Sequence, residues 1–288
     1  MQSAQPMTSS DRQQPADGKL DGFLAAAIEA ARAGGEVIRN GARNRATLAI
    51  ERKKENDFVS VVDKGSEQAI IGSLAAKYPA HAFIAEETGN SGNSEYVWLI
   101  DPLDGTTNFL HGFPHYCVSI ALRIREQVMV AVIFDPVSDR LFTATRGGGA
   151  WLNGERIRVS PRAGLAEAMV GTGIPFSDWS FLDEYMDSLR IIVQRCAGIR
   201  RAGAAALDLA FVAAGWIDGF WEKNLHPWDV GAGSLLIEEA GGVVSDFSGG
   251  DSYLTAGQVV TGAPGVHREL LDVLRRYPAL SRPRTVSA

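Results

Sequence analysis

Cysteine is scarce in this sequence of 288 residues, with only Cys117 and Cys196, both in apolar or helical surroundings. We therefore expect no disulfide framework, and a reducing cytoplasm is the natural location. Long apolar runs are also missing, because none approaches the ~18 residues that a membrane span requires. Basic residues are in the minority, with 28 Lys and Arg against 34 Asp and Glu and a net charge of −6. This balance disfavours a nucleic-acid-binding protein, which would carry a basic surface.

The two ends of the sequence differ from its middle. Residues 1–18 are rich in Gln, Ser, Pro and Asp, and lack the features of a secretory signal or transit peptide. We expect a disordered tail over 1–18 and a flexible tail over 281–288. The rest has ordinary globular composition, with 45% hydrophobic residues in the chain. We divide it into an N-terminal α+β half, 19–158, and a C-terminal α/β half, 159–280.

Periodicity predicts helices that alternate with blocks of strands. The expected helices cover residues 21–40, 66–77, 181–196, 204–214 and 229–240. The expected strands include 118–124, 128–134, 140–145, 168–172 and 217–221. Asn153 and Gly154 form a strong signal for a two-residue hairpin turn. This pattern indicates an α/β (α+β layered) fold with stacked layers of helix and sheet.

The most informative stretch is residues 101–107, which follows an apolar run at 96–100 that is typical of a buried strand. It contains two carboxylates three residues apart, Asp101 and Asp104. Pro102 fixes its own φ and pushes Asp101 into an extended conformation, so we expect a rigid turn at the end of the strand. The turn would direct both carboxylates and the Leu103 carbonyl into one small volume. Such hard oxygen donors suit Mg²⁺, although Pro-Asp and Asp-Gly pairs are also ordinary turn chemistry.

Backbone N–H groups follow these acids at once. Those of Gly105, Thr106 and Thr107 can form a nest for a phosphate group. A metal site and an anion cradle within seven residues suggest a phosphate-ester hydrolase.

Other acids stand at the borders of predicted elements and are candidate ligands of the same metal site. Asp63 precedes a predicted helix, Glu86 and Glu87 follow a short apolar strand, and Asp229 opens the long apolar helix. Each also has a simpler interpretation: Asp63 and Asp229 as helix N-caps, and Glu86 and Glu87 as a solvated loop.

Taken together and in this order, the segments strongly resemble the inositol monophosphatase family of Mg²⁺-dependent sugar phosphatases. The matching segments are residues 57–63, 85–87, 98–109, 228–233 and 239–242. Residues 200–209 make the bacterial inositol-1-monophosphatase branch the most similar. Ser60 and Ala85 depart from the usual Thr and Gly of the family, and neither departure removes a ligand. The resemblance, over about residues 20–275, implies a five-layer αβαβα sandwich, a homodimer and inhibition by Li⁺.

The resemblance also implies roles for individual residues. It implies that two or three Mg²⁺ are held by Glu86, Asp101, the Leu103 carbonyl, Asp104 and Asp229, with Asp63 contributing to the third. The catalytic residues it implies are Glu86, Thr106 and Asp63, where Asp63 orients Thr106. The substrate-binding residues it implies are Asp104, Gly105, Thr106, Thr107, Ala205 and Glu222.

Several assignments leave alternatives open. Glu222 would accept hydrogen bonds from sugar hydroxyls, or else be an exposed residue at a strand end. Arg201 would orient a helix, reach an interface or be solvated. The following residues are interpreted as packing or hydrogen-bonding groups: His111, His115, His226 and Trp228.

The expected function is Mg²⁺-dependent hydrolysis of myo-inositol monophosphate, or of a related polyol or sugar monophosphate, by metal-activated water. Like-charge pairs near 4 Å cost on the order of 4 kcal/mol each at an effective dielectric of 20, so the clustered acids require cations. Alternative substrates are histidinol phosphate, a nucleotide 3′-phosphate and fructose 1,6-bisphosphate, although no Arg or Lys cluster for a second phosphate is obvious. A hypothesis of another class is a non-catalytic docking partner. We expect no direct nucleic-acid or membrane partner.

Overall fold

The structure is a computed structural model that describes residues 17–45, 50–54, 57–175 and 178–282. The first helix, α1 (Asp17–Arg43), begins before the expected boundary, so Asp17 and Gly18 of the expected tail are helical. The remainder of that tail and the expected tail after Arg282 lie outside the described residues.

Within these described ranges, seven further helices follow α1. They are α2 (Val61–Lys77), α3 (Thr106–His111), α4 (Leu182–Val193), α5 (Ala205–Ala213), α6 (Pro227–Glu239), α7 (Tyr253–Ala256) and α8 (Pro264–Leu274), and a 3₁₀ turn covers Leu165–Glu167. Within the described residues, no helix is both long and apolar enough to cross a membrane.

An eight-stranded sheet occupies the N-terminal half, in the order β10-β9-β8-β7-β6-β5-β3-β4. Its strands are β3 (Ala82–Ala85), β4 (Gly89–Ser91), β5 (Tyr96–Asp104), β6 (Cys117–Ile124), β7 (Gln127–Asp135), β8 (Arg140–Thr145), β9 (Gly149–Leu152) and β10 (Glu155–Arg156). All neighbours pair antiparallel except β3 and β5, which are parallel. The predicted two-residue turn is confirmed between β9 and β10, where Asn153 and Gly154 have φ values of 50° and 84°.

A five-stranded sheet occupies the C-terminal half, in the order β12-β11-β13-β15-β14. Its strands are β11 (Met169–Thr172), β12 (Gly198–Arg200), β13 (Gly219–Lys223), β14 (Val243–Ser245) and β15 (Gln258–Gly262). A separate two-stranded hairpin joins β1 (Ile50–Lys54) to β2 (Asp57–Ser60). The last strand of the eight-stranded sheet ends at Arg156 and the first strand of the five-stranded sheet begins at Met169. The boundary of two halves at 158/159 stays a prediction.

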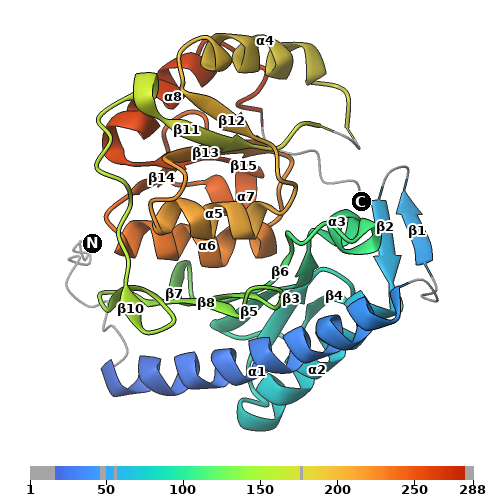
Figure 1. Cartoon of the computed structure of the whole chain (residues 1–288). Helices are drawn as coiled ribbons and strands as arrows, with labels where there is room; N and C mark the ends of the chain where they lie inside the picture. Colours follow the sequence, from blue (N-terminus) through green and yellow to red (C-terminus); the bar gives the residue numbers. More distant parts are fainter. Residues whose placement is uncertain (1–16, 46–49, 55–56, 176–177, 283–288) are drawn as a thin grey trace, which may run out of the picture.

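The elements stack as five layers, which confirms the expected αβαβα sandwich. Figure 1 shows α1 and α2 on one face of the eight-stranded sheet and α5 and α6 on its other face. The five-stranded sheet lies beyond α5 and α6, and α4 and α8 cover its outer face. The middle helices therefore contact both sheets, which explains why α6 is apolar over almost its whole surface.

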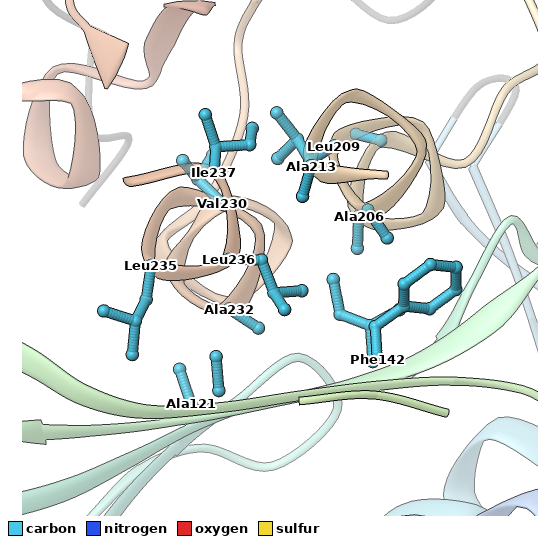
Figure 2. Packing of buried hydrophobic residues seen from close by; sticks show 14 of the residues in the cluster. Ala121, Phe142, Ala206, Leu209, Ala213, Val230, Ala232, Leu235, Leu236 and Ile237 are labelled. Carbon is cyan, nitrogen blue, oxygen red and sulfur yellow. The ribbon is translucent and has the colours of Figure 1, made fainter. Parts of the chain in front are cut away.

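Three buried clusters fill the spaces between the layers. Figure 2 shows the central one, where Leu235 and Leu236 of α6 and Leu209 of α5 pack above Ala121 and Phe142 of the sheet. A second cluster joins α1 and α2 to the opposite face of that sheet. A third joins the five-stranded sheet to α4 and α8. Each fully buried large apolar side chain contributes about 1.5–3 kcal/mol to the free energy of folding, so these clusters stabilise the stacking of the layers.

Candidate active site

Asp101 and Asp104 lie together because β5 contains a bulge between them. Asp101 pairs with Ser119 and Asp104 pairs with Cys117, so two residues of β5 face a single residue of β6. Side chains three apart on a regular strand point to opposite faces, and one extra residue returns them to the same face. The expected turn at the end of the strand is therefore wrong in form, since β5 runs on through Asp104. The prediction that the two acids meet does not depend on that turn.

Asp101 is almost completely buried, with 2% of its surface exposed. Its Oδ1 accepts a hydrogen bond from the Leu103 N–H at 3.0 Å, which fixes the carboxylate across the bulge. Burial raises the pKa of Asp101 well above its ordinary value. Three neighbouring carboxylates raise this pKa further: Glu86, Asp104 and Asp229. Glu86 and Asp229, which are more than 140 residues apart in the sequence, thus both raise the pKa of Asp101.

Glu86 reaches the site because β3 runs parallel to β5. Ala85 pairs with Ile100, and the Glu86 N–H donates to the Ile100 carbonyl at 3.2 Å. Glu86, the residue after β3, therefore lies beside Asp101, the residue of β5 that follows Ile100. The alternative interpretation of Glu86 as a solvated loop residue is not supported, because its charge raises the pKa of both Asp101 and Asp229.

Asp229 arrives from the N-terminus of α6. It is the third residue of the helix, and its Oδ2 accepts a hydrogen bond from the His226 N–H at 2.7 Å. Asp229 is therefore not the N-cap, a position that His226 occupies. Ser119 Oγ donates to the Trp228 carbonyl at 3.1 Å and ties this helix end to β6. Burial raises the pKa of Asp229, and the charge of Asp104 raises it further.

Asp63 occupies the same position in α2 that Asp229 occupies in α6. Its Oδ2 accepts hydrogen bonds from the N–H and the hydroxyl of Ser60, at 2.8 and 2.6 Å. Ser60, not Asp63, is the N-cap. Asp63 Oδ1 accepts a hydrogen bond from Thr106 Oγ1 at 2.8 Å. The interpretation of Asp63 as the N-cap is therefore wrong in position, although its carboxylate completes the capping box and also holds Thr106. Its role as a metal ligand stays a prediction.

Asp104 contacts the N-terminus of α5 across 102 residues of sequence. Its Oδ2 accepts a hydrogen bond from the Ala206 N–H at 2.7 Å, where α5 has no side-chain cap of its own. Burial raises the pKa of Asp104 to about 6, and the helix N–H groups of Ala206 and Leu207 oppose that rise. Ala205 is the first residue of α5 and lies next to this contact. Its contact with the sugar ring stays a prediction.

Gly105 connects these acids to α3. Its φ of 88° lies in the left-handed region, and a side chain there would place Cβ 2.9 Å from the His115 carbonyl oxygen. Thr106 and Thr107 form the first turn of α3, where backbone N–H groups have no partner within the helix. The first turn of α3 therefore follows the acids directly, and its use as a phosphate cradle stays a prediction.

Glu222 belongs to β13 in the five-stranded sheet. Burial raises its pKa to about 8. Arg201 lowers this pKa, whereas nearby carboxylates raise it: Asp208, Asp229 and Asp104. A side chain at Gly173 would meet the Glu222 carboxylate, so this glycine leaves the space that the carboxylate fills. Glu222 thus lies within electrostatic range of Asp229 and Asp104 and is partly buried, so it is not an exposed strand end.

The histidines and Trp228 have packing or hydrogen-bonding partners, as interpreted. His111 donates from Nδ1 to the Thr107 carbonyl at 2.9 Å, and His115 Nε2 lies 3.2 Å from Asp208 Oδ1. The rings of His226 and Trp228 stack with centroids 4.3 Å apart.

Sequence reasoning missed four residues that hold the site. Glu67 accepts the N–H groups of Glu87 and Thr88, and Asn108 Nδ2 donates to the carbonyls of His115 and Ala202. The others are Gly173 and Asp208. Glu67 carries a local sequence signal, because it follows Asp63 by four residues and so shares its face of the predicted helix. Asn108 and Asp208 lie within residues 98–109 and 200–209, which carry the family resemblance.

The donor set fits Mg²⁺ in its chemistry. Four acids with hard oxygen donors lie close enough to change one another's protonation: Glu86, Asp101, Asp104 and Asp229. No three His, Cys, Asp or Glu side chains in the described ranges form a closed group arranged for a metal ion. Mg²⁺ does not require such a cage, since it is usually bound by one or two carboxylates, with waters and substrate phosphate oxygens. Which of these oxygens bind metal stays a prediction.

Known proteins share this sequence and architecture. The sequence model of the inositol monophosphatase family matches residues 19–278. A protein of Pseudomonas aeruginosa named Nus factor SuhB is 46% identical over 268 residues, covering 90% of this chain and 99% of its own. The crystal structure of extragenic suppressor protein suhB from Bartonella henselae has a TM-score of 0.86 at 38% identity, over 89% of this chain and 99% of its own. The structure of an inositol monophosphatase from Anabaena has a TM-score of 0.79 at 37% identity, over 91% and 99%.

Proposed function

Because the chain belongs to the inositol monophosphatase family, we propose that it is a Mg²⁺-dependent phosphomonoesterase. The substrate we propose is myo-inositol monophosphate or a related polyol or sugar monophosphate. One observation carries the proposal: the carboxylates of Glu86, Asp104 and Asp229 converge on the buried Asp101 and raise its pKa. An uncompensated group of buried acids is costly, and divalent cations with a bound phosphate ester would compensate it.

The chain's own groups have distinct tasks in this reaction. When bound, Mg²⁺ would supply an activated water and charge stabilisation for the departing alkoxide. Thr106 Oγ1 is held between Asp63 Oδ1 at 2.8 Å and the Leu103 carbonyl at 3.1 Å, so its lone pairs can steer the proton of the attacking water. Glu86 is the second group that accepts or steers the proton of the attacking water.

Two further groups recognise the substrate in this proposal. The N–H groups of Gly105, Thr106 and Thr107 stabilise charge on the non-bridging phosphate oxygens. Glu222 accepts hydrogen bonds from hydroxyls of the polyol, because its carboxylate lies within electrostatic range of Asp229 and Asp104.

Phosphate release from a panel of phosphorylated metabolites, with Mg²⁺ and with EDTA, tests the proposal. We expect release from myo-inositol 1-phosphate only with Mg²⁺, and Li⁺ should inhibit it at low Mg²⁺. Asp101→Asn should lower kcat by about 100-fold or more. Asp135→Asn is the matched control, because Asp135 is equally buried at 2% and its Oδ1 also accepts the N–H two residues later, at 2.8 Å. Release in EDTA at the rate seen with Mg²⁺ would refute the proposal.

The nearest alternatives differ only in substrate. Histidinol phosphate carries an ammonium group that the Glu222 carboxylate could pair with, and a nucleotide 3′-phosphate is the third candidate. Turnover of myo-inositol 1-phosphate and histidinol phosphate, measured side by side, separates the first two. A greater kcat/KM for histidinol phosphate would replace the proposed substrate and retain the chemistry.

A second candidate function is a docking role beside catalysis. It is favoured by the name Nus factor that the Pseudomonas aeruginosa relative carries. Asp104→Asn separates the two roles, because it should abolish hydrolysis while a docking phenotype in cells would persist. We also propose a homodimer, which light scattering of the purified chain would reveal.

A further inference from the structure

One face of α2 carries three polar side chains spaced at i, i+3 and i+4, which places them side by side. They are Asp63, Ser66 and Glu67, each at most 1% exposed. Asp63 holds Thr106, and Ser66 Oγ donates to the Pro102 carbonyl at 2.8 Å, within the bulge of β5.

Glu67 makes the third connection. Its Oε2 accepts the N–H of Glu87 at 2.8 Å, and its Oε1 accepts the N–H of Thr88 at 2.9 Å. Both carboxylate oxygens are therefore used on consecutive amides of the loop after β3. Two bonds to neighbouring amides fix the direction of that backbone as well as its distance from the helix.

The loop that Glu67 holds begins at Glu86. On its other side, the Glu86 N–H donates to the Ile100 carbonyl of β5. Glu86 is thus fixed from the sheet before it and from α2 after it. Without Glu67, the loop that follows Glu86 would lose both of these hydrogen bonds to α2.

We propose that Glu67 is a positioning residue for Glu86, acting through the amides of Glu87 and Thr88. The proposal rests on the proposed function, because it assigns Glu86 the metal and proton roles given above. Together with Asp63 and Ser66, Glu67 makes one face of α2 the common support for three separate segments of the site.

Glu67→Gln tests the proposal, since it retains the shape of the side chain and replaces one acceptor oxygen with an NH₂ group, which donates and cannot accept. Glu239→Gln is the matched control. Glu239 of α6 also accepts two loop amides, those of Gly147 at 2.8 Å and Gly149 at 2.9 Å. Glu239 lies ten residues beyond Asp229, about 15 Å along the helix. Glu239→Gln therefore removes the same type of hydrogen bond at a position away from the site.

Amide hydrogen exchange, Mg²⁺ binding and steady-state kinetics are measured on both variants. We expect Glu67→Gln to speed amide hydrogen exchange at residues 86–88 before metal is added. It should weaken the binding of MgCl₂ alone, by calorimetry, and lower kcat, each by about tenfold or more, with KM changed by less than about threefold. Glu239→Gln should change exchange only near residues 147–149 and leave Mg²⁺ affinity and kcat within about twofold of the unsubstituted chain.

The proposal is overturned if Glu67→Gln and Glu239→Gln have the same kcat and the same Mg²⁺ affinity. If Glu67→Gln does not fold, the unsubstituted chain still tests the proposal. Its Glu87 and Thr88 amides should exchange slowly without metal, because both donate to Glu67. Exchange as fast as in an exposed loop refutes the positioning role. If the unsubstituted chain hydrolyses no phosphate ester, the proposed function fails, and Glu67 is judged by exchange and Mg²⁺ titration alone.

Discussion

Thr106 Oγ1 donates a 2.8 Å hydrogen bond to Asp63 Oδ1, which joins the start of α3 to the first turn of α2 across 43 residues. The other oxygen of Asp63 is engaged by Ser60, so this carboxylate cannot turn away without breaking the N-terminal cap of α2. The orientation of the Thr106 hydroxyl is therefore tied to the stability of a helix.

Removing that hydroxyl tests its catalytic role. Thr106→Val should lower kcat by about 100-fold, because the proton of the attacking water loses its acceptor, while KM changes little. It should also lower the free energy of unfolding by about 1–3 kcal/mol, since Asp63 Oδ1 loses its donor. Thr255→Val is the control, because Thr255 Oγ1 likewise donates to a carbonyl three residues earlier, at 3.1 Å. A kcat of Thr106→Val near that of the control would contradict the assigned role.

The stability of the metal-free protein should fall as pH rises. Burial raises the pKa of Asp104 to about 6 and that of Glu222 to about 8, so the folded chain binds these protons more tightly than the unfolded chain. The stabilisation is complete below the ordinary carboxyl pKa, near 4, and is lost as pH rises through the folded values. His267 acts in the opposite sense at low pH, since burial lowers its pKa to about 4.

Urea unfolding in EDTA between about pH 7 and 8 reports the Glu222 contribution together with those of the other buried acids, and His267 contributes little because this range lies above its ordinary pKa. The free energy of unfolding should decline over this range, and Glu222→Gln should flatten the decline. Mg²⁺ should stabilise the fold more at the higher pH, because ligands must lose their protons to bind metal. A free energy of unfolding that rises with pH in EDTA would contradict the raised pKa values.

Gly173→Ala should alter substrate binding more than folding. The new Cβ would occupy the space of the Glu222 carboxylate, which is the movable end of a long side chain. We expect KM for myo-inositol 1-phosphate to rise about tenfold, with kcat nearly unchanged, because a hydroxyl acceptor is displaced. A double-mutant cycle supplies the control: in a Glu222→Ala background, Gly173→Ala should have no further effect. An equal effect in both backgrounds would exclude Glu222 as the cause.

Gly233→Ala tests the packing of the middle layer. Its Cβ would overlap the Leu209 side chain, where α5 and α6 lie against each other. The free energy of unfolding should fall by about 1–3 kcal/mol, although Ala favours the helix. Gly72→Ala is the control, because nothing lies within 4 Å of a Cβ there, and it should raise stability by up to about 1 kcal/mol. Thermal unfolding of both variants measures the difference, and a stabilised Gly233→Ala would contradict the close packing.

Much of the fold was accessible from local pattern. Apolar periodicity located the helices and most strands, and the Asn153-Gly154 pair fixed a hairpin turn through its own backbone preferences. The motif at 101–107 identified the acids correctly as neighbours, yet the expected turn was a bulge. Whether two residues of β5 face one or two residues of β6 depends on the partner strand, which a local pattern does not contain.

The sequence alone determined which residues are candidates for the site and which elements carry them, because side-chain type and backbone preference act over a few neighbouring positions. Only the tertiary structure decided which groups meet. Asp104 caps α5 across 102 residues, and Glu67 holds the loop beyond Glu86. These long-range contacts depend on how the five layers pack together and bury their apolar faces. The energy of that burial depends on the whole stack and is not encoded at any single position.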